Sequence, residues 1–112
     1  MLPTHIQSVK KGTAAVDDVQ MVNGRTRLKG VIVCSTALAA GGTNVKLYNG
    51  TDDTGTIGLE LEYTVWSVYG GTQMIPIPGN GILFDAGIFL SKDYSTAGIV
   101  SVTAIFQGGE AA

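Results

Sequence analysis

Few side chains in this sequence have the chemistry that catalysis requires. His5 is the only histidine, so a Ser-His-Asp arrangement or a histidine metal cluster would have to be built on a residue close to the N-terminus. Glu60 and Glu62 are two positions apart, which on a strand puts both carboxylates on one face about 7 Å apart. The same pattern is typical of a solvent-facing strand. We therefore predict a protein that is not an enzyme and needs no cofactor.

An acidic segment offers a second, different chemistry. Residues 49–55 include Asp52 and Asp53, whose oxygens are the ligands that a hard cation such as Ca²⁺ prefers. Their spacing is not that of an EF-hand loop. An ordinary hydrophilic turn is the favoured interpretation, and no metal site is predicted.

Aromatic residues after the glutamates indicate a protein partner instead. Trp66 continues the strand face that carries Glu60 and Glu62, and Tyr69 follows it. Trp and Tyr dominate the binding energy of protein interfaces, so both are candidate interface residues. In the alternative, the strand bends near Val65 and Trp66 joins the core.

A basic row forms the second candidate interface. Arg25, Arg27 and Lys29 alternate along one strand face, and Val31 and Val33 continue it. Two apolar side chains that face away from the core would be covered by association of identical copies, and we expect a homotrimer. The alternative is a solvated edge strand that its charges protect from aggregation.

The elements that must carry these residues are all strands. Period-two alternation recurs with turn residues every eight to twelve positions, as in β-sandwiches and barrels. Strands are predicted at 4–9, 14–22, 25–36, 44–48, 57–65, 73–77, 81–84, 87–91 and 98–106. We expect an antiparallel β-sandwich of about eight strands, with jelly-roll or related Greek-key topology.

The alternation also predicts the core and the turns. The expected core consists of Leu28, Ile32, Val45, Leu47, Leu59, Leu61 and Phe106, with Cys34 as a buried thiol beside it. Hairpin turns are expected at the three Asn-Gly pairs, which begin at Asn23, Asn49 and Asn80, because these dipeptides tolerate positive φ. Pro76 and Pro78 predict that 73–78 form an edge strand or a connection between the sheets.

Composition limits the remaining function classes. The chain has 112 residues and is expected to form one domain over 1–112, in which 1–22 either form an arm or complete the sandwich. A net charge of −2 argues against a nucleic-acid partner. With a single cysteine, no signal-peptide pattern and no long apolar run, we expect synthesis in a reducing cytoplasm and no membrane partner.

The segment from Gly30 to Phe106 resembles small structural proteins of tailed bacteriophages. The matching motifs are GVIV at 30–33, TALAAGG at 36–42, VKLYNG at 45–50, TGT at 54–56, IPGNGILF at 77–84, AGIFL at 86–90 and VSVTAIF at 100–106. The resemblance implies a jelly-roll or sandwich domain of the virion. Such domains decorate capsids as cement proteins, with the major capsid protein as partner, or lie in other virion parts.

Two functions follow as expectations. The first is a capsid cement protein on the virion surface that acts through protein contacts alone. The second is a tail or fibre module that binds a host receptor or glycan through Trp66, Tyr69 and the Asp52-Asp53 segment. Retention on purified capsids favours the first, and glycan binding by the isolated protein favours the second.

Overall fold

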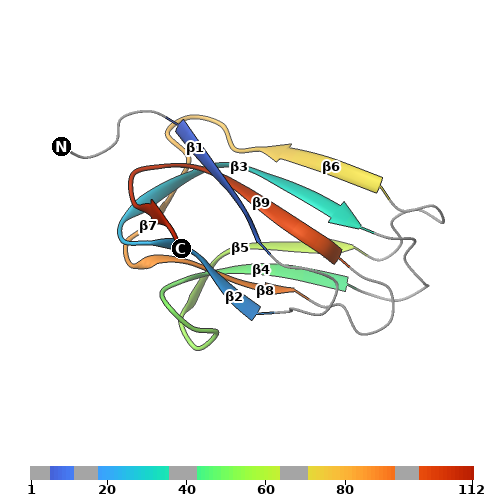
Figure 1. Cartoon of the computed structure of the whole chain (residues 1–112), viewed down its shortest axis with the longest axis horizontal. Coiled ribbons are helices and arrows are strands. Elements are labelled where there is room, and N and C mark those ends of the chain that lie inside the picture. Colours follow the sequence, from blue (N-terminus) through green and yellow to red (C-terminus); the bar gives the residue numbers. More distant parts are fainter. Residues whose placement is uncertain (1–5, 12–17, 36–42, 64–70, 93–98) are drawn as a thin grey trace.

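The computed structural model contains two antiparallel sheets packed face to face (Figure 1). It describes residues 6–11, 18–35, 43–63, 71–92 and 99–112. Every element in these ranges is a strand. They are β1 (Ile6–Lys11), β2 (Asp18–Asn23), β3 (Thr26–Ser35), β4 (Thr43–Asn49), β5 (Thr56–Tyr63), β6 (Gly71–Pro76), β7 (Ile82–Phe84), β8 (Gly87–Lys92), β9 (Ile99–Gln107) and β10 (Glu110–Ala111).

The strand order is that of a jelly roll. Sheet A runs β1-β9-β3-β6, with β7 also paired to β3, and sheet B runs β10-β2-β8-β4-β5. The pairs β4–β5, β3–β6, β2–β8 and β1–β9 are nested in the sequence and alternate between the sheets. A long antiparallel ribbon wrapped on itself produces this arrangement. The predicted antiparallel sandwich is therefore confirmed, and β1 and β2 from the N-terminal region supply one strand to each sheet.

The core lies between the sheets and draws on both. Sheet A contributes the fully buried apolar side chains Leu28, Val31, Val33, Phe84, Val102, Ala104 and Phe106. Sheet B contributes Met21, Val22, Val45, Leu47, Ile88 and Leu90. Four predicted core residues are among them. Leu59 and Leu61 are partly buried and pack against this cluster, so six of the seven predicted core positions contact the core.

The exception, Ile32, results from an extra residue in β3. Leu28 pairs with Phe106 and Gly30 with Ile105, so Lys29 is a bulge that has no partner on β9. A bulge shifts the two-residue period by one, and side chains beyond it change face.

The shift corrects several predictions for β3. Val31 and Val33 are fully buried in the core, so the prediction that they face away from it is wrong. Ile32 and Cys34 lie on the opposite, outer face and are half-buried. Cys34 is therefore not a core thiol, and its Sγ lies 3.4 Å from the Thr72 hydroxyl.

A second bulge shapes β5. Leu47 pairs with Leu59 and Tyr48 with Ile57, which leaves Gly58 without a partner on β4. Ile57, which simple alternation would place on the same face as Leu59 and Leu61, is 41% exposed. A side chain at Gly58 would meet the Phe84 ring, since an added Cβ would lie 2.5 Å from Phe84 Cε2. Phe84 of sheet A thus occupies space that Gly58 leaves open in sheet B.

Only one of the three Asn-Gly pairs begins a hairpin loop. Asn49-Gly50 opens the connection between β4 and β5, which pair with each other. Asn23-Gly24 connects β2 of sheet B to β3 of sheet A, and Asn80-Gly81 lies between β6 and β7, which both pair with β3. Of the two alternatives for 73–78, the edge strand is correct up to Pro76, because β6 ends sheet A, and Pro78 lies between β6 and β7, which both belong to that sheet.

Gly58→Ala tests the contact with Phe84. The new methyl group would overpack the site, and we expect it to lower the free energy of unfolding by about 1–3 kcal/mol, measured by chemical denaturation. Gly30→Ala is the matched control, because its Cβ would lie 3.4 Å from the nearest atom, an ordinary contact. In the double variant with Phe84→Leu, the cost of the Gly58 change should shrink. Equal costs for the two glycine variants would contradict the assigned packing.

The bulge at Lys29 predicts opposite sensitivities for adjacent residues. Val33→Ala removes buried methyl groups and should cost about 1.5–3 kcal/mol of unfolding free energy. Ile32→Ala removes more atoms but from the outer face, and it should cost less. Simple alternation without the bulge would give the reverse order in the same denaturation experiment.

Candidate functional site

The structure describes only some of the predicted interface residues. Trp66 and Tyr69 lie outside the described residues. Val31 and Val33 belong to the core, which removes the observation that favoured a homotrimer. Arg25 is exposed, and Arg27 and Lys29 are half-buried.

The three basic residues do not form one continuous row. Arg25 is exposed in the β2–β3 corner, and Arg27 is half-buried on the outer face of β3. Lys29 is the bulge residue, and its carbonyl accepts a hydrogen bond of 3.0 Å from the Ile77 amide. The alternative of a charged edge strand is wrong, because β3 lies inside sheet A between β9 and the β6 and β7 strands.

The outer face of sheet A carries apolar side chains that a solvated sheet face would lack. Met74 lies directly opposite Ile32, and directly opposed residues point to the same face. Ile105 lies opposite Gly30, and its Cδ1 approaches to 3.4 Å from where a Cβ of Gly30 would be. Ile6 on β1 extends this surface. We call Ile6, Ile32, Met74 and Ile105 the apolar patch.

Exposure shows that the apolar patch is a real surface feature. Met74 is 58% and Ile6 60% exposed, and both Ile32 and Ile105 are half-buried. An antiparallel sandwich usually has polar outer faces, and contiguous exposed apolar residues mark interaction sites. The sequence did not reveal the patch because its members come from four separate strands.

Charge is distributed unequally between the two sheets. Within the described residues, the strands of sheet A contain four basic residues and no Asp or Glu; the four are Lys10, Lys11, Arg27 and Lys29. The strands of sheet B contain four acidic residues, Asp18, Glu60, Glu62 and Glu110, against Lys46 and Lys92. A chain with net charge −2 thus has one sheet whose strands are purely basic.

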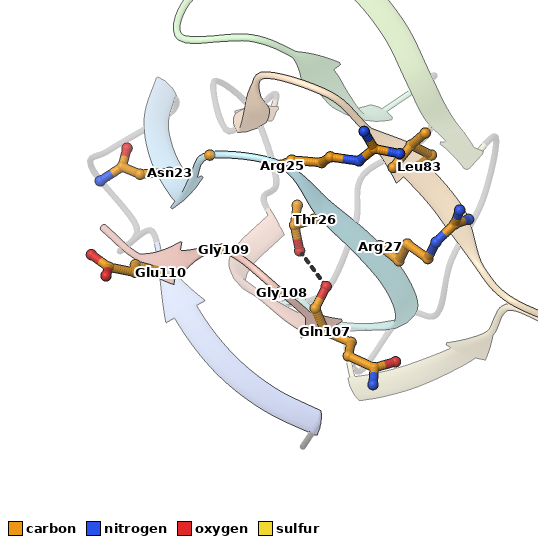
Figure 2. A pocket seen from close by; sticks show the side chains of 10 residues that line it. Asn23, Arg25, Thr26, Arg27, Leu83, Gln107, Gly108, Gly109 and Glu110 are labelled. Carbon is orange, nitrogen blue, oxygen red and sulfur yellow. Dashed lines mark hydrogen bonds between the residues drawn. The ribbon is translucent and has the colours of Figure 1, made fainter. Parts of the chain in front are cut away.

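A hollow of about 640 Å³ opens at the end of sheet A beside the apolar patch (Figure 2). Two corners border it, β2–β3 at Gly24 and β9–β10 at Gly108 and Gly109, which have φ of 82°, 82° and 71°. Such φ values strain any residue with a side chain. The two corners lie close together, since a Cβ at Gly108 would be 3.2 Å from the Arg25 carbonyl oxygen and one at Gly109 would be 2.9 Å from that of Asn23.

The hollow has a basic end and an acidic end. Figure 2 shows Arg25 and Arg27 extending to the same side, next to Leu83, which lies directly opposite Arg27 on β7. Asn23 and Glu110 lie at the other end, with their side chains directed away from the guanidinium groups. Among the described residues, no carboxylate forms an ion pair with either arginine.

A buried hydroxyl holds the wall of the hollow in place. Thr26, which is 1% exposed, donates a hydrogen bond of 3.2 Å from Oγ1 to the Gln107 carbonyl. This bond joins β3 to the end of β9, at the position where β9 turns toward β10. Arg25 and Arg27, on either side of Thr26, are therefore carried on a fixed backbone.

The acidic segment after β4 is a self-contained turn. Asp52 Oδ1 accepts hydrogen bonds from the Thr54 hydroxyl (2.6 Å) and the Thr54 amide (3.0 Å). These two bonds, the hydroxyl foremost, lower the pKa of Asp52 below its usual value. The segment is also tied to the β7–β8 corner, where the Ala86 amide donates to Asn49 Oδ1 at 2.9 Å.

Metal-ligand clusters and membrane-spanning helices are absent from the part of the chain that the structure describes. There, no three His, Cys, Asp or Glu side chains gather in a way that would hold a metal ion. Those ranges also contain no helix long and apolar enough to cross a membrane. Glu60 is exposed on sheet B.

Comparison with known proteins adds no family assignment. No protein-family model matches the sequence, and no curated protein matches it. The function must therefore be argued from the fold and from the surfaces described above.

The pKa of Asp52 provides a test of the turn. Thr54→Val removes the hydroxyl donor, so the pKa of Asp52 should rise toward its usual value, as measured by an NMR titration of the carboxyl carbon. Thr51→Val, in the same exposed loop, is the control and should leave it unchanged. An unaltered Asp52 pKa in the Thr54 variant would show that the hydroxyl does not hold the carboxylate.

Proposed function

We propose that this chain is a structural protein of a bacteriophage virion, most specifically a cement protein that binds the major capsid protein. The apolar patch on the outer face of sheet A carries this proposal. The patch combines exposed Met74 and Ile6 with half-buried Ile32 and Ile105. When a partner covers these side chains, burial of their apolar surface lowers the free energy of the complex. The resemblance of residues 30–106 to phage structural proteins supplies the class of partner.

The jelly roll suits this role because it separates stability from binding. The inner faces of both sheets fill the core, so the outer face of sheet A is free to vary in composition without loss of the fold. A cement protein that binds the assembled lattice better than free capsid subunits stabilises the lattice by linkage. Many copies add their contributions, and each needs only a standard-sized interface with a few strong contacts.

Charge supports the choice of sheet A as the binding side. A surface rich in basic residues is drawn to an acidic partner, which raises the association rate and fixes orientation more than it adds affinity. The acidic strands of sheet B face the opposite side of the sandwich. We therefore expect the chain to approach the capsid with sheet A.

Met74→Glu on sheet A should weaken binding to purified capsids that lack this protein by about tenfold or more, because it buries a charge in the interface. Binding is measured by co-sedimentation over a concentration series. Ile57→Glu is the matched control, since Ile57 is also partly exposed but lies on sheet B, and it should bind like the wild type. Thermal unfolding of both variants confirms that they are folded.

The function itself is tested on particles with and without the protein. Particles with it should survive higher temperature and stronger osmotic shock. Equal resistance, or location of the chain in the tail, would contradict the cement role. Unchanged capsid binding by Met74→Glu would contradict the assignment of the apolar patch, and binding of glycans to the isolated chain would favour receptor recognition.

A further inference from the structure

We infer that the hollow between the two glycine corners is a carboxylate-binding site that takes one Asp or Glu side chain from a protein partner. The inference deepens the proposed function and rests on it for the identity of that partner. Its physical basis is a pair of arginines without an acidic partner in the described part of the chain, placed at one end of a pre-formed space.

The arginines supply the donors that carboxylate recognition needs. Arg25 lies in the β2–β3 corner and Arg27 on β3, and both line the hollow. Both side chains extend to the same side, past Leu83 (Figure 2). A guanidinium group presents planar, parallel N–H donors that match the two oxygens of a carboxylate.

The surroundings limit the freedom of the Arg27 side chain before a ligand arrives. Arg27 is half-buried, with Gln107 and Leu83 directly opposite it on its two neighbouring strands. The Thr26 hydroxyl bond to the Gln107 carbonyl fixes the backbone between the arginines. Side chains that are already restrained lose less entropy on binding, which increases affinity for a given set of contacts.

The size and lining of the hollow favour a side chain on a polypeptide over a free ion. A volume of about 640 Å³ falls within the range of binding pockets for small molecules, roughly 300–1,000 Å³, and exceeds the need of one carboxylate. Leu83 and the bare glycine backbone at Gly24, Gly108 and Gly109 provide space for an adjacent apolar segment. The apolar patch continues from the hollow, since Ile6 lies opposite Gln107.

The acidic end of the hollow selects against polyanions. Glu110 lines the same space on the side away from the arginines. A single carboxylate contacts the basic end without approaching Glu110, whereas a nucleic-acid backbone would bring further negative charges toward it. One acidic side chain is therefore the occupant that the charges fit.

The test uses the purified chain and a small probe, so it does not depend on capsids. The probe is an N-acetylated, C-amidated Gly-Glu-Gly peptide, with the Gly-Gln-Gly peptide as the uncharged control. In two-dimensional NMR titrations, the Glu peptide should give saturable shifts at Gly24, Arg25, Gly108 and Gly109, with a dissociation constant on the order of millimolar. The Gln peptide should give none there.

Substitutions assign the binding to the arginines. The double variant Arg25→Gln/Arg27→Gln should bind the Glu peptide about 10- to 100-fold more weakly, as expected when hydrogen bonds to a charged group are lost. Arg25→Lys/Arg27→Lys keeps the charge but not the paired donors, and an intermediate affinity is expected. Lys46→Gln, which removes a positive charge from sheet B, is the control and should not change binding.

The outcomes separate this inference from the proposed function. Equal shifts with both peptides, or full binding by the double Gln variant, would overturn the carboxylate site even if the chain binds capsids. Arginine-dependent peptide binding by a chain that does not bind capsids would support the site and overturn the cement role. If both are right, the double Gln variant should also lose about tenfold or more of its capsid affinity.

Discussion

The bulge at Lys29 is the constraint on which the two faces of sheet A depend. One inserted residue reverses the alternation of a strand. The even-numbered residues of β3 therefore face the core before Lys29 and face outward after it. Val31 and Val33 then fill the core, and Ile32 joins Met74 on the outside. The bulge also lies where the edge of the sheet is interrupted. The Lys29 carbonyl accepts a hydrogen bond from the Ile77 amide. The residues between β6 and β7 form no ladder with β3 at this position.

The sequence predicted the strands better than their faces, for a physical reason. Alternation within one strand is local, so every long strand and its approximate bounds were predictable, and Val45, Leu47 and Phe106 were correctly assigned to the core. A bulge depends on the partner strand, which lies far away in the sequence. Val31, Val33 and Ile32 were misassigned for that reason. Asn-Gly pairs likewise predict a tight turn but not whether the flanking strands pair, and two of the three connect strands that do not pair with each other.

The candidate site was predictable only in part. Arg25 and Arg27 were identified from their alternation, and they do lie together. Their neighbours were not, because the β9–β10 corner is brought beside the β2–β3 corner by the jelly-roll wrapping alone. Both corners line the hollow, and its residues span positions 23 to 110 of the chain. No local pattern records such an arrangement.

The distribution of charge explains how one small sandwich can keep an apolar outer face. Exposed apolar surface promotes unspecific association unless neighbouring charges oppose it. The basic residues on the strands of sheet A repel the same face of another copy, while acidic residues outside these strands bring the whole chain to a net charge of −2. An acidic partner removes that repulsion and covers the apolar patch at the same time. In the proposed complex, electrostatics would therefore select the partner and orient the chain, and burial of the apolar patch would provide the affinity.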